Sequence, residues 1–334
     1  DRYIHYAVKS AEDAMQDAQI AIDKENPLRC GVIYGSGMGG VHTLDVNIGG
    51  VGAGDGTPRY SPFFIPMIIT NIAAGMLAMR YGFKGVNFAT TSACSSSSHA
   101  IANACYQIRM GLADIILTGG SEAAVECSGI GGFNALHALS TRNDSPQTAS
   151  RPFSASRDGF VLGEGAAALV LEEYEHAVAR GAEIIAEVCG YGNTCDAHHV
   201  TAPRPDGQTQ AAAIRLALDE AGYTSDDLLY INAHGTGTAL NDVCETQAFK
   251  LALGKDAYKA HISSTKGSTG HMLGAAGAVE AVASVLALKN GIVPPTAHLD
   301  EIEPECDLNY TPNTPVEAPL TIAISDSLGF GGHN

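Results

Sequence analysis

The amino-acid sequence predicts an α/β fold in which short buried strands alternate with longer helices. Short apolar or β-branched runs bounded by glycine indicate the strands, and Ala-rich runs with helical spacing indicate the helices between them. The 38 glycines mostly lie in clusters between the apolar runs and follow no period. They therefore indicate tight connections rather than a collagen-like or low-complexity chain. Such an alternation is typical of sheets covered by helices.

The expected elements follow one another along the chain. Strands are expected at residues 32–34, 86–89, 115–118, 166–171, 184–188, 229–232 and 320–324. Helices are expected at residues 6–22, 95–110, 208–222, 242–253 and 273–289. A Gly-rich loop is expected at residues 49–57, and a polar loop at residues 141–150.

Two of these helices, at residues 95–110 and 273–289, carry little charge and many small side chains. A helix that is apolar on all sides is expected inside a large protein, between two layers. Glu280 lies in the second helix. We expect it to have a partner, because a buried carboxylate is rarely left unpaired.

Composition narrows the classes of function. Hydrophobic residues make up 45% of the 334 residues and charged residues 16%, enough for a large core in one domain or two packed halves. The net charge of −17 argues against nucleic acid and against an anionic membrane surface as partners. The eight cysteines are scattered without a Cys-x-x-Cys pair, so we expect reduced thiols, a cytoplasmic location and no metal site. We also expect no transmembrane helix, because no apolar stretch is judged long enough.

Cys94 is the first candidate for catalysis. It follows an expected strand and precedes an expected helix, in the sequence Thr91-Ser92-Ala93-Cys94-Ser95. At such a turn the helix dipole and free backbone N–H groups stabilise a thiolate, and the N–H groups can also bind a developing oxyanion. Most cysteines are core residues, and we interpret the other seven in that way. The position of Cys94 instead predicts a nucleophile.

Two histidines and a lysine form the second group of candidates. His234 lies at the end of an expected strand, before a loop of small residues, and such positions usually line a site in α/β folds. His271 precedes the small-residue helix at residues 273–289, as Cys94 precedes the other one. Lys266 lies five positions before His271 across a Gly/Ser turn, so both side chains can face one pocket. The lysine would then lower the pKa of a nearby imidazole.

Two glycine-rich motifs remain. Phe330 lies between Gly329 and Gly331-Gly332, where glycine allows unusual backbone dihedrals, so Phe330 can supply a second oxyanion N–H group or gate a pocket.

The other motif, Gly35-Ser36-Gly37-Met38-Gly39-Gly40, matches Gly-x-Gly-x-x-Gly after a strand, and Asp55 lies downstream. This pattern is typical of a dinucleotide site. The Gly-rich stretch at residues 49–57 interrupts the βαβ unit that such a site needs. We therefore interpret the motif as a structural glycine turn.

These motifs resemble the four signatures of β-ketoacyl-acyl-carrier-protein synthases. The signatures are Cys94, His234 with residues 235–238, Lys266 with Gly270-His271, and residues 329–332. The similarity continues through residues 138–144, 157–165 and 171–176 and covers essentially the whole chain. Type II enzymes of the elongating class, synthase II in particular, are the most similar. The Ser-rich run after Cys94 and the Thr-Gly-Thr after His234 also resemble polyketide ketosynthases.

The resemblance implies a thiolase-like fold of two similar halves, stacked α-β-α-β-α, in a homodimer. We place the halves at residues 1–171 and 172–334. Members of the family have a further strand and helices before the position of Asp1 and a final strand after that of Asn334. We expect these segments to be missing from this chain.

The resemblance also implies a decarboxylative Claisen condensation. Cys94 would take an acyl chain from an acyl carrier protein as a thioester. A malonyl group on a second carrier would then lose carbon dioxide with the help of His234 and His271, and its carbanion would attack the thioester. Backbone N–H groups of Cys94 and Phe330 would hold the tetrahedral oxyanion.

Supporting residues follow from the same resemblance. Lys266 and Glu280 would orient the histidines and their surroundings rather than react. Thr201, Thr236 and Thr238 would contact the pantetheine arm or the malonyl group. No cofactor is implied beyond the phosphopantetheine arm of the acyl carrier protein that carries the substrates.

The implied partner raises an electrostatic problem. Acyl carrier proteins are acidic, and so is this chain, so docking needs a local basic patch that opposes the net field. Arg59 is the best candidate for this patch, with Arg2 and His137 as further members.

Three alternatives stay open. A ketosynthase of a type II polyketide or polyene pathway would share the chemistry. A Cys/His acyl hydrolase or acyltransferase is disfavoured, because hydrolysis needs one base and this chain offers both His234 and His271. A catalytically silent partner subunit is disfavoured by the presence of Cys94.

Overall fold

The computed structural model describes residues 1–334 and divides them into two compact units. The first unit consists of Asp1–Phe133, Gly163–Ile184 and Met272–Val279. The second consists of Asn134–Leu162, Ile185–His271 and Glu280–Asn334. Each unit is therefore assembled from three stretches of chain. A single boundary between residues 171 and 172 stays a prediction.

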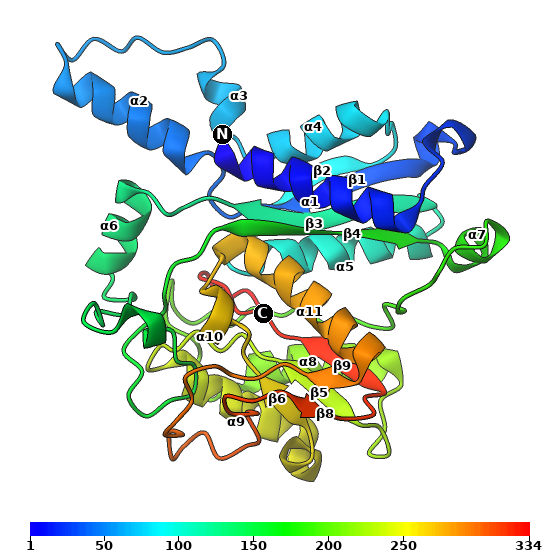
Figure 1. The fold of residues 1–334 in the computed structure, drawn as a ribbon, viewed down its shortest axis with the longest axis vertical. Coiled ribbons are helices and arrows are strands. Elements are labelled where there is room, and N and C mark those ends of the chain that lie inside the picture. Colours follow the sequence, from blue (N-terminus) through cyan, green and yellow to red (C-terminus); the bar gives the residue numbers. More distant parts are fainter. The chain divides into compact units, whose positions relative to one another are not determined.

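The first unit contains a four-stranded sheet with helices on both faces (Figure 1). Its strands are β1 (Cys30–Gly35), β2 (Asn87–Thr90), β3 (Ile115–Glu122) and β4 (Gly165–Glu172). Its helices are α1 (Arg2–Ala18), α2 (Val41–Ala53), α3 (Phe64–Ile68), α4 (Ile72–Tyr81), α5 (Ser96–Arg109), α6 (Cys127–Ala135, its last two residues in the second unit) and α7 (Tyr174–Ala179). The strand order is β2-β1-β3-β4, in which β1, β2 and β3 are parallel and β4 is antiparallel to β3.

Alternating side chains give the sheet of the first unit two separate cores. Val32 and Tyr34 pack in the cluster that contains residues of α1 and α4, whereas Ile33 packs with Ala100 and Ala104 of α5. The small side chains of α5 let it approach the sheet closely. A Cβ atom on Gly35 would lie 2.6 Å from the backbone nitrogen of Ser97, so only glycine fits at the end of β1.

The second unit contains a three-stranded parallel sheet in the order β6-β5-β9. Its strands are β5 (Leu229–Asn232), β6 (His261–Ser263) and β9 (Ile322–Ser325), with a separate antiparallel pair of β7 (Ile292–Val293) and β8 (Val316–Glu317). Its helices are α8 (Gln208–Ala221), α9 (Asn241–Leu253), α10 (Lys266–Thr269) and α11 (Ala276–Asn290, its first four residues in the first unit). Short 3₁₀ turns lie in the second unit at Pro146–Thr148 and Gly254–Tyr258, and in the first unit at Ile22–Lys24, Pro27–Arg29 and Leu273–Ala275.

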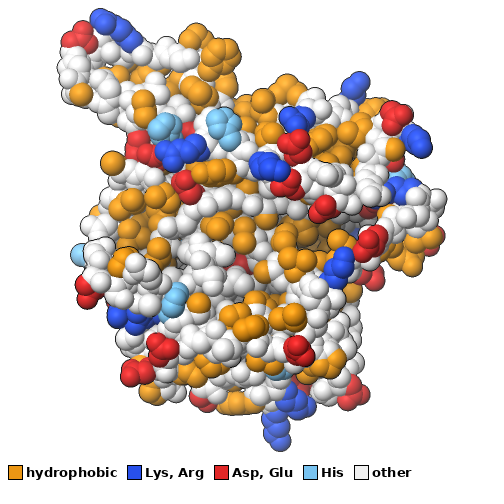
Figure 2. Space-filling view, in the orientation of Figure 1, with side chains coloured by type: hydrophobic (Ala, Val, Ile, Leu, Met, Phe, Trp, Pro, Cys, Tyr) orange, Lys and Arg blue, Asp and Glu red, His pale blue; other side chains and the backbone are white.

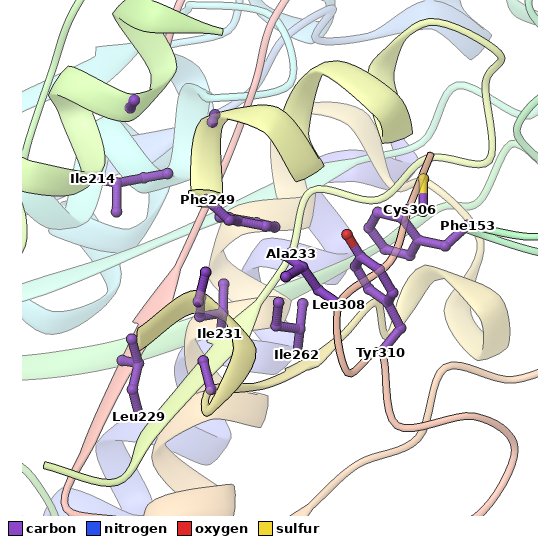
Figure 3. Packing of buried hydrophobic residues seen from close by; sticks show 14 of the residues in the cluster. Phe153, Ile214, Leu229, Ile231, Ala233, Phe249, Ile262, Cys306, Leu308 and Tyr310 are labelled. Carbon is purple, nitrogen blue, oxygen red and sulfur yellow. The ribbon is translucent and has the colours of Figure 1, made fainter. Parts of the chain in front are cut away.

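The same alternation divides the core of the second unit. Leu229 and Ile231 point into the cluster that holds Ile214 of α8 and Phe249 of α9 (Figure 3). Tyr230 lies on the opposite face, in a cluster with residues of α11, β7 and β9. Both units are thus sheets covered by helices on two faces, as the alternation of strands and helices in the sequence predicts.

Three sequence predictions need correction. Residues 184–188 form no strand, and Ile184 and Ile185 are exposed. The run has strand propensity, but propensity is expressed only where a neighbouring strand supplies a ladder. The predicted loop at residues 49–57 is helical up to Ala53, because α2 continues through Gly49 and Gly50 before it ends at Gly54. Finally, Leu273–Asn290 is long and apolar enough to cross a membrane by length and composition, and half of it is buried, as in the core helix of a soluble protein.

Candidate active site

Cys94 lies in a tight turn between β2 and α5. The strand ends at Thr90 and the helix begins at Ser96, as the sequence predicts, and Cys94 is 8% exposed. Ala93 has a φ of 50°, a left-handed conformation that non-glycine residues rarely adopt. The Ser96 hydroxyl donates to the carbonyl of Ala93 at 2.6 Å and accepts from the backbone N–H of Ser92 at 2.9 Å. Cys94 thus directly follows the strained residue Ala93 and lies in a turn that is closed by hydrogen bonds.

The glycine motif after β1 is a structural turn and not a dinucleotide site. The carboxylate of Glu122 accepts hydrogen bonds from the backbone N–H groups of Gly37 and Met38, at 2.7 and 3.1 Å. A bound pyrophosphate needs such N–H groups and repels a carboxylate. The N–H groups of the motif therefore bind a carboxylate of the protein itself.

Four predicted residues come together in the second unit. The rings of His234 and His271 meet edge to face with their centroids 5.2 Å apart. Lys266 Nζ lies 3.4 Å from His234 Nδ1 and forms an ion pair with Glu280. All four side chains are buried. The expected partner of Glu280 is thus Lys266.

The two histidines of this cluster are held by backbone hydrogen bonds and by one ring contact. His234 follows β5 by two residues, and the carboxylate of Glu245 accepts the backbone N–H groups of His234 and Gly235. His271 donates its backbone N–H to the carbonyl of Val161 at 2.7 Å. The ring of Phe160 meets the His271 ring edge-on at 5.2 Å. These contacts fix the backbone at both histidines, and the ring of Phe160 packs against the imidazole of His271.

Burial and Lys266 together keep both imidazoles neutral. Burial lowers the pKa of His234 well below its usual range, and the positive charge of Lys266 lowers it further. The pKa of His271 is lowered by the same two causes. Burial raises the pKa of Glu280, and Lys266 opposes that rise. Two neutral imidazoles can donate hydrogen bonds to a developing negative charge.

Two carboxylates that were not predicted from the sequence support the histidine loop. Asp242 accepts the backbone N–H groups of Phe153 and Gly237, at 2.7 and 3.1 Å, and Glu245 acts in the same way one helical turn later. Both belong to α9 and are fully buried. Their spacing of three residues at the start of a helix is the signal that identifies them, since it places both on one face.

Phe330 lies in a turn shaped by glycine. Gly331 and Gly332 have φ angles of 92° and 76°, and Gly329 donates its N–H to the carbonyl of His333 at 2.7 Å. The N–H of Gly331 binds the carbonyl of Val200 at 2.8 Å, which brings the segment before Thr201 against this turn.

Of the three predicted threonines, Thr236 and Thr238 lie together and Thr201 lies in a different loop. The hydroxyls of Thr236 and Thr238 lie 2.9 Å apart, in the loop that follows His234. Thr201 instead donates its backbone N–H to His199 Nδ1 at 3.1 Å.

The residues expected for carrier docking differ in their environment. The Arg59 side chain is 78% exposed and lies 3.4 Å from Asp55. Arg2 pairs with Glu126 and lies 3.5 Å from Glu164, so its charge is balanced within its own unit. His137 has a φ of 53°. Both arginines have a carboxylate partner, and Arg59 is the more exposed of the two, at 78% against 42% for Arg2.

The predicted residues are distributed over both units. Cys94 belongs to the first unit, and the histidine cluster and Phe330 belong to the second. The approach of Cys94 to the two histidines stays a prediction of the resemblance.

Comparisons with known families match almost the whole chain. Residues 1–177 match the model described as "Beta-ketoacyl synthase, N-terminal domain", and residues 185–300 match "Beta-ketoacyl synthase, C-terminal domain". The chain is 47% identical to the 3-oxoacyl-[acyl-carrier-protein] synthase 2 of Synechocystis and 46% identical to that of Staphylococcus aureus. Both alignments cover 100% of this chain and 80% of the relative.

Solved structures share the fold. A β-ketoacyl synthase from Burkholderia phymatum is 38% identical with a TM-score of 0.93, over 100% of this chain and 80% of that one. A type II polyketide ketosynthase in complex with its acyl-carrier protein is 36% identical, also with a TM-score of 0.93, over 99% of this chain and 83% of that one.

Proposed function

Because the chain belongs to the β-ketoacyl synthase family and has its thiolase-like fold, we propose that Cys94 carries the acyl chain for condensation with malonyl-acyl carrier protein in fatty-acid elongation. The protein is an acyltransferase that joins carbon chains. The observation that supports the assignment of its residues best is the pair of buried, neutral imidazoles of His234 and His271.

In the first half-reaction, Cys94 Sγ attacks the carbonyl carbon of the acyl thioester on the carrier protein. A tetrahedral oxyanion forms, and the backbone N–H groups of Cys94 and Phe330 are proposed to bind it. The bond between the carbonyl carbon and the pantetheine sulfur then breaks. The pantetheine leaves as a thiolate that takes up a proton from solvent, and the acyl chain stays on Cys94 as a thioester.

In the second half-reaction, malonyl-acyl carrier protein loses its carboxylate as carbon dioxide. The electron pair of the broken carbon–carbon bond forms an enolate, whose oxygen accepts hydrogen bonds from His234 and His271. The α-carbon attacks the thioester on Cys94, and the carbon–sulfur bond breaks. The β-ketoacyl product is two carbons longer, and Cys94 returns to its thiolate.

Charged and polar neighbours are proposed to support these steps. Burial lowers the pKa of both imidazoles, the charge of Lys266 lowers it further, and Glu280 balances Lys266 in the buried site. The hydroxyls of Thr236 and Thr238 would bind the malonyl group or the pantetheine arm, and Thr201 would contact the arm beside the turn of Phe330.

The proposed partners are an acyl carrier protein and a second copy of this chain, in the cytoplasm. Arg59 supplies an exposed positive charge for the acidic carrier. In Figure 1, α2 stands away from the sheet of the first unit, and Figure 2 shows apolar side chains gathered over this part. The exposed apolar residues there are Val46, Ile48, Phe63 and Ile65. Such a surface is suited to a protein partner, as a homodimer requires.

The deciding experiment mixes the protein with an acyl-acyl carrier protein and malonyl-acyl carrier protein and identifies the products by mass spectrometry. A β-ketoacyl product extended by two carbons supports condensation. Free acid without extension would instead indicate the hydrolase. The likeness to a polyketide ketosynthase favours one further arm of this experiment, in which repeated extension without β-reduction would indicate a polyketide pathway.

A further inference from the structure

A buried carboxylate in the first unit has no part in the mechanism above. Glu122 is the last residue of β3 and is fully buried. It accepts four hydrogen bonds: from the N–H groups of Gly37 (2.7 Å), Met38 (3.1 Å) and Gly274 (3.0 Å), and from the Ser36 hydroxyl (3.1 Å). All four donors are neutral. Burial raises the pKa of Glu122, and these hydrogen bonds oppose the rise.

These hydrogen bonds hold two stretches of chain, which are far apart in sequence, against the end of β3. A Cβ atom on Gly37 would lie 2.9 Å from Glu122 Oε2, and one on Gly274 would lie 2.3 Å from the backbone nitrogen of Gly37. Only glycine allows approaches this close. The glycine motif after β1 and the segment before α11 are thus built around one carboxylate.

The first of these stretches supports the turn that carries Cys94. Ser36 donates its N–H to the carbonyl of Thr90 at 3.2 Å, and its own carbonyl accepts the Thr91 hydroxyl at 3.1 Å. The carbonyl of Ala93 lies 3.3 Å from the Cβ position of Gly37. The glycine motif therefore contacts the chain on both sides of Ser92 and at the strained residue itself.

The second stretch reaches the helix that follows Cys94. Ala278 donates its N–H to the hydroxyl of Ser97, in the first turn of α5, at 2.9 Å. A left-handed, non-glycine residue such as Ala93 persists only where its surroundings hold it. Both stretches that bind Glu122 belong to those surroundings.

We propose that Glu122 is a positioning residue for the acylation of Cys94: its carboxylate holds the glycine motif and the segment before α11 against the nucleophile turn and so keeps Cys94 in its reactive position. This inference rests on the proposed role of Cys94 as the nucleophile. Glu122 acts through the backbone and does not touch the substrate.

The test replaces Glu122 by glutamine, which keeps the shape but points an amide N–H₂ group at backbone N–H donors that need an acceptor. Active sites are first counted by alkylation of Cys94. The rate constant of acylation per active site is then measured with acyl-acyl carrier protein. We expect it to fall roughly ten- to hundredfold, because small displacements of a nucleophile are costly. The KM for the carrier stays near the wild-type value, so the loss lies in the acylation step per active site, a split that general destabilisation does not produce.

A matched control and a milder variant complete the test. Glu172→Gln alters another carboxylate of the first unit, whose partners are Arg180 and His176, and leaves acylation unchanged. Ser36→Ala removes one of the four donors and lowers acylation roughly fivefold. This variant decides the question if Glu122→Gln does not fold.

Two results overturn the inference: a folded Glu122→Gln enzyme that acylates Cys94 at the wild-type rate, or, where that variant does not fold, a wild-type rate for Ser36→Ala. Failure of the proposed function is recognised separately. In that case the wild-type protein itself forms no thioester at Cys94.

Discussion

The turn that carries Cys94 and the cluster that contains His234 and His271 hold their reactive groups in different ways. The turn is held by backbone N–H groups and hydroxyls, and the carboxylate of Glu122, which is proposed to position it, binds neutral donors. The histidine cluster instead contains a buried ion pair between Lys266 and Glu280.

The difference matches what each region is proposed to supply. A nucleophile needs a fixed position and nearby N–H groups, which a strained turn before a helix provides. The imidazoles need a fixed protonation state, which burial and the charge of Lys266 provide. One region is thus built for geometry and the other for charge. The following variants test this contrast, from the largest expected effect to the smallest.

Cys94→Ala removes the nucleophile from the turn and should abolish the acyl-enzyme completely. The fold should persist, because the side chain is small and the turn is held by its neighbours. Intact-mass spectrometry after incubation with acyl-acyl carrier protein measures the loss, and circular dichroism checks the fold. An acyl adduct that persists on another residue would contradict the assignment of Cys94.

Lys266→Met should destabilise the histidine cluster more than any change to the turn. The variant leaves Glu280 buried without its cation, which costs about 3–5 kcal/mol in comparable sites. Chemical denaturation measures the loss in the free energy of unfolding. The matched double variant Lys266→Met with Glu280→Gln should recover much of it. Equal stability of the single variant and the wild type would show that the ion pair does not hold this cluster.

The sequence predicted those parts of the site that depend on local chain signals. Cys94 lies at a strand-to-helix turn, His234 follows a strand, and the charge of Lys266 adds to burial in lowering the pKa of His271, five residues later, as their positions along the chain indicate. The contact between Lys266 and His234, which are 32 residues apart in sequence, was not predicted. Glu122 was not predicted, because its donors Gly37 and Gly274 lie 85 and 152 residues away in sequence. No local sequence pattern indicates such a contact.

The error at residues 184–188 has the same origin. Residues 184–188 have the composition of a strand, but a strand forms only beside a partner, and the partner is set by the tertiary structure. The alternation of strands and helices was predictable, since it depends on periodicity within each segment. The assembly of each unit from three stretches was not, because it depends on contacts between segments far apart.

His271→Ala should separate the two half-reactions. Decarboxylation of malonyl-acyl carrier protein should fall by roughly 10²–10³, because one of two proposed donors to the enolate is lost. Acylation of Cys94 should persist, since the turn does not depend on the imidazole. Release of carbon dioxide and the mass of the acyl-enzyme are measured on the same sample. Carbon dioxide release at the wild-type rate would remove His271 from the mechanism.

The pH dependence of stability should give the smallest effect and the most direct test of the contrast. Both imidazoles are neutral in the folded protein with a lowered pKa, whereas in the unfolded chain they titrate near 6.5. Below pH 6.5 the unfolded state therefore binds more protons, so each histidine lowers the free energy of unfolding as the pH falls, by up to about 1.4 kcal/mol per pH unit. Above pH 6.5 this contribution is constant.

Unfolding measured at several values between pH 7.5 and 5.5 should thus show a shallower slope for His271→Ala than for the wild type. Cys94→Ala should keep the wild-type slope, because it changes the region built for geometry and leaves both imidazoles buried. A Cys94→Ala slope as shallow as that of His271→Ala would mean that the nucleophile turn also controls the protonation of the histidines, and the two regions would then have to be treated as one.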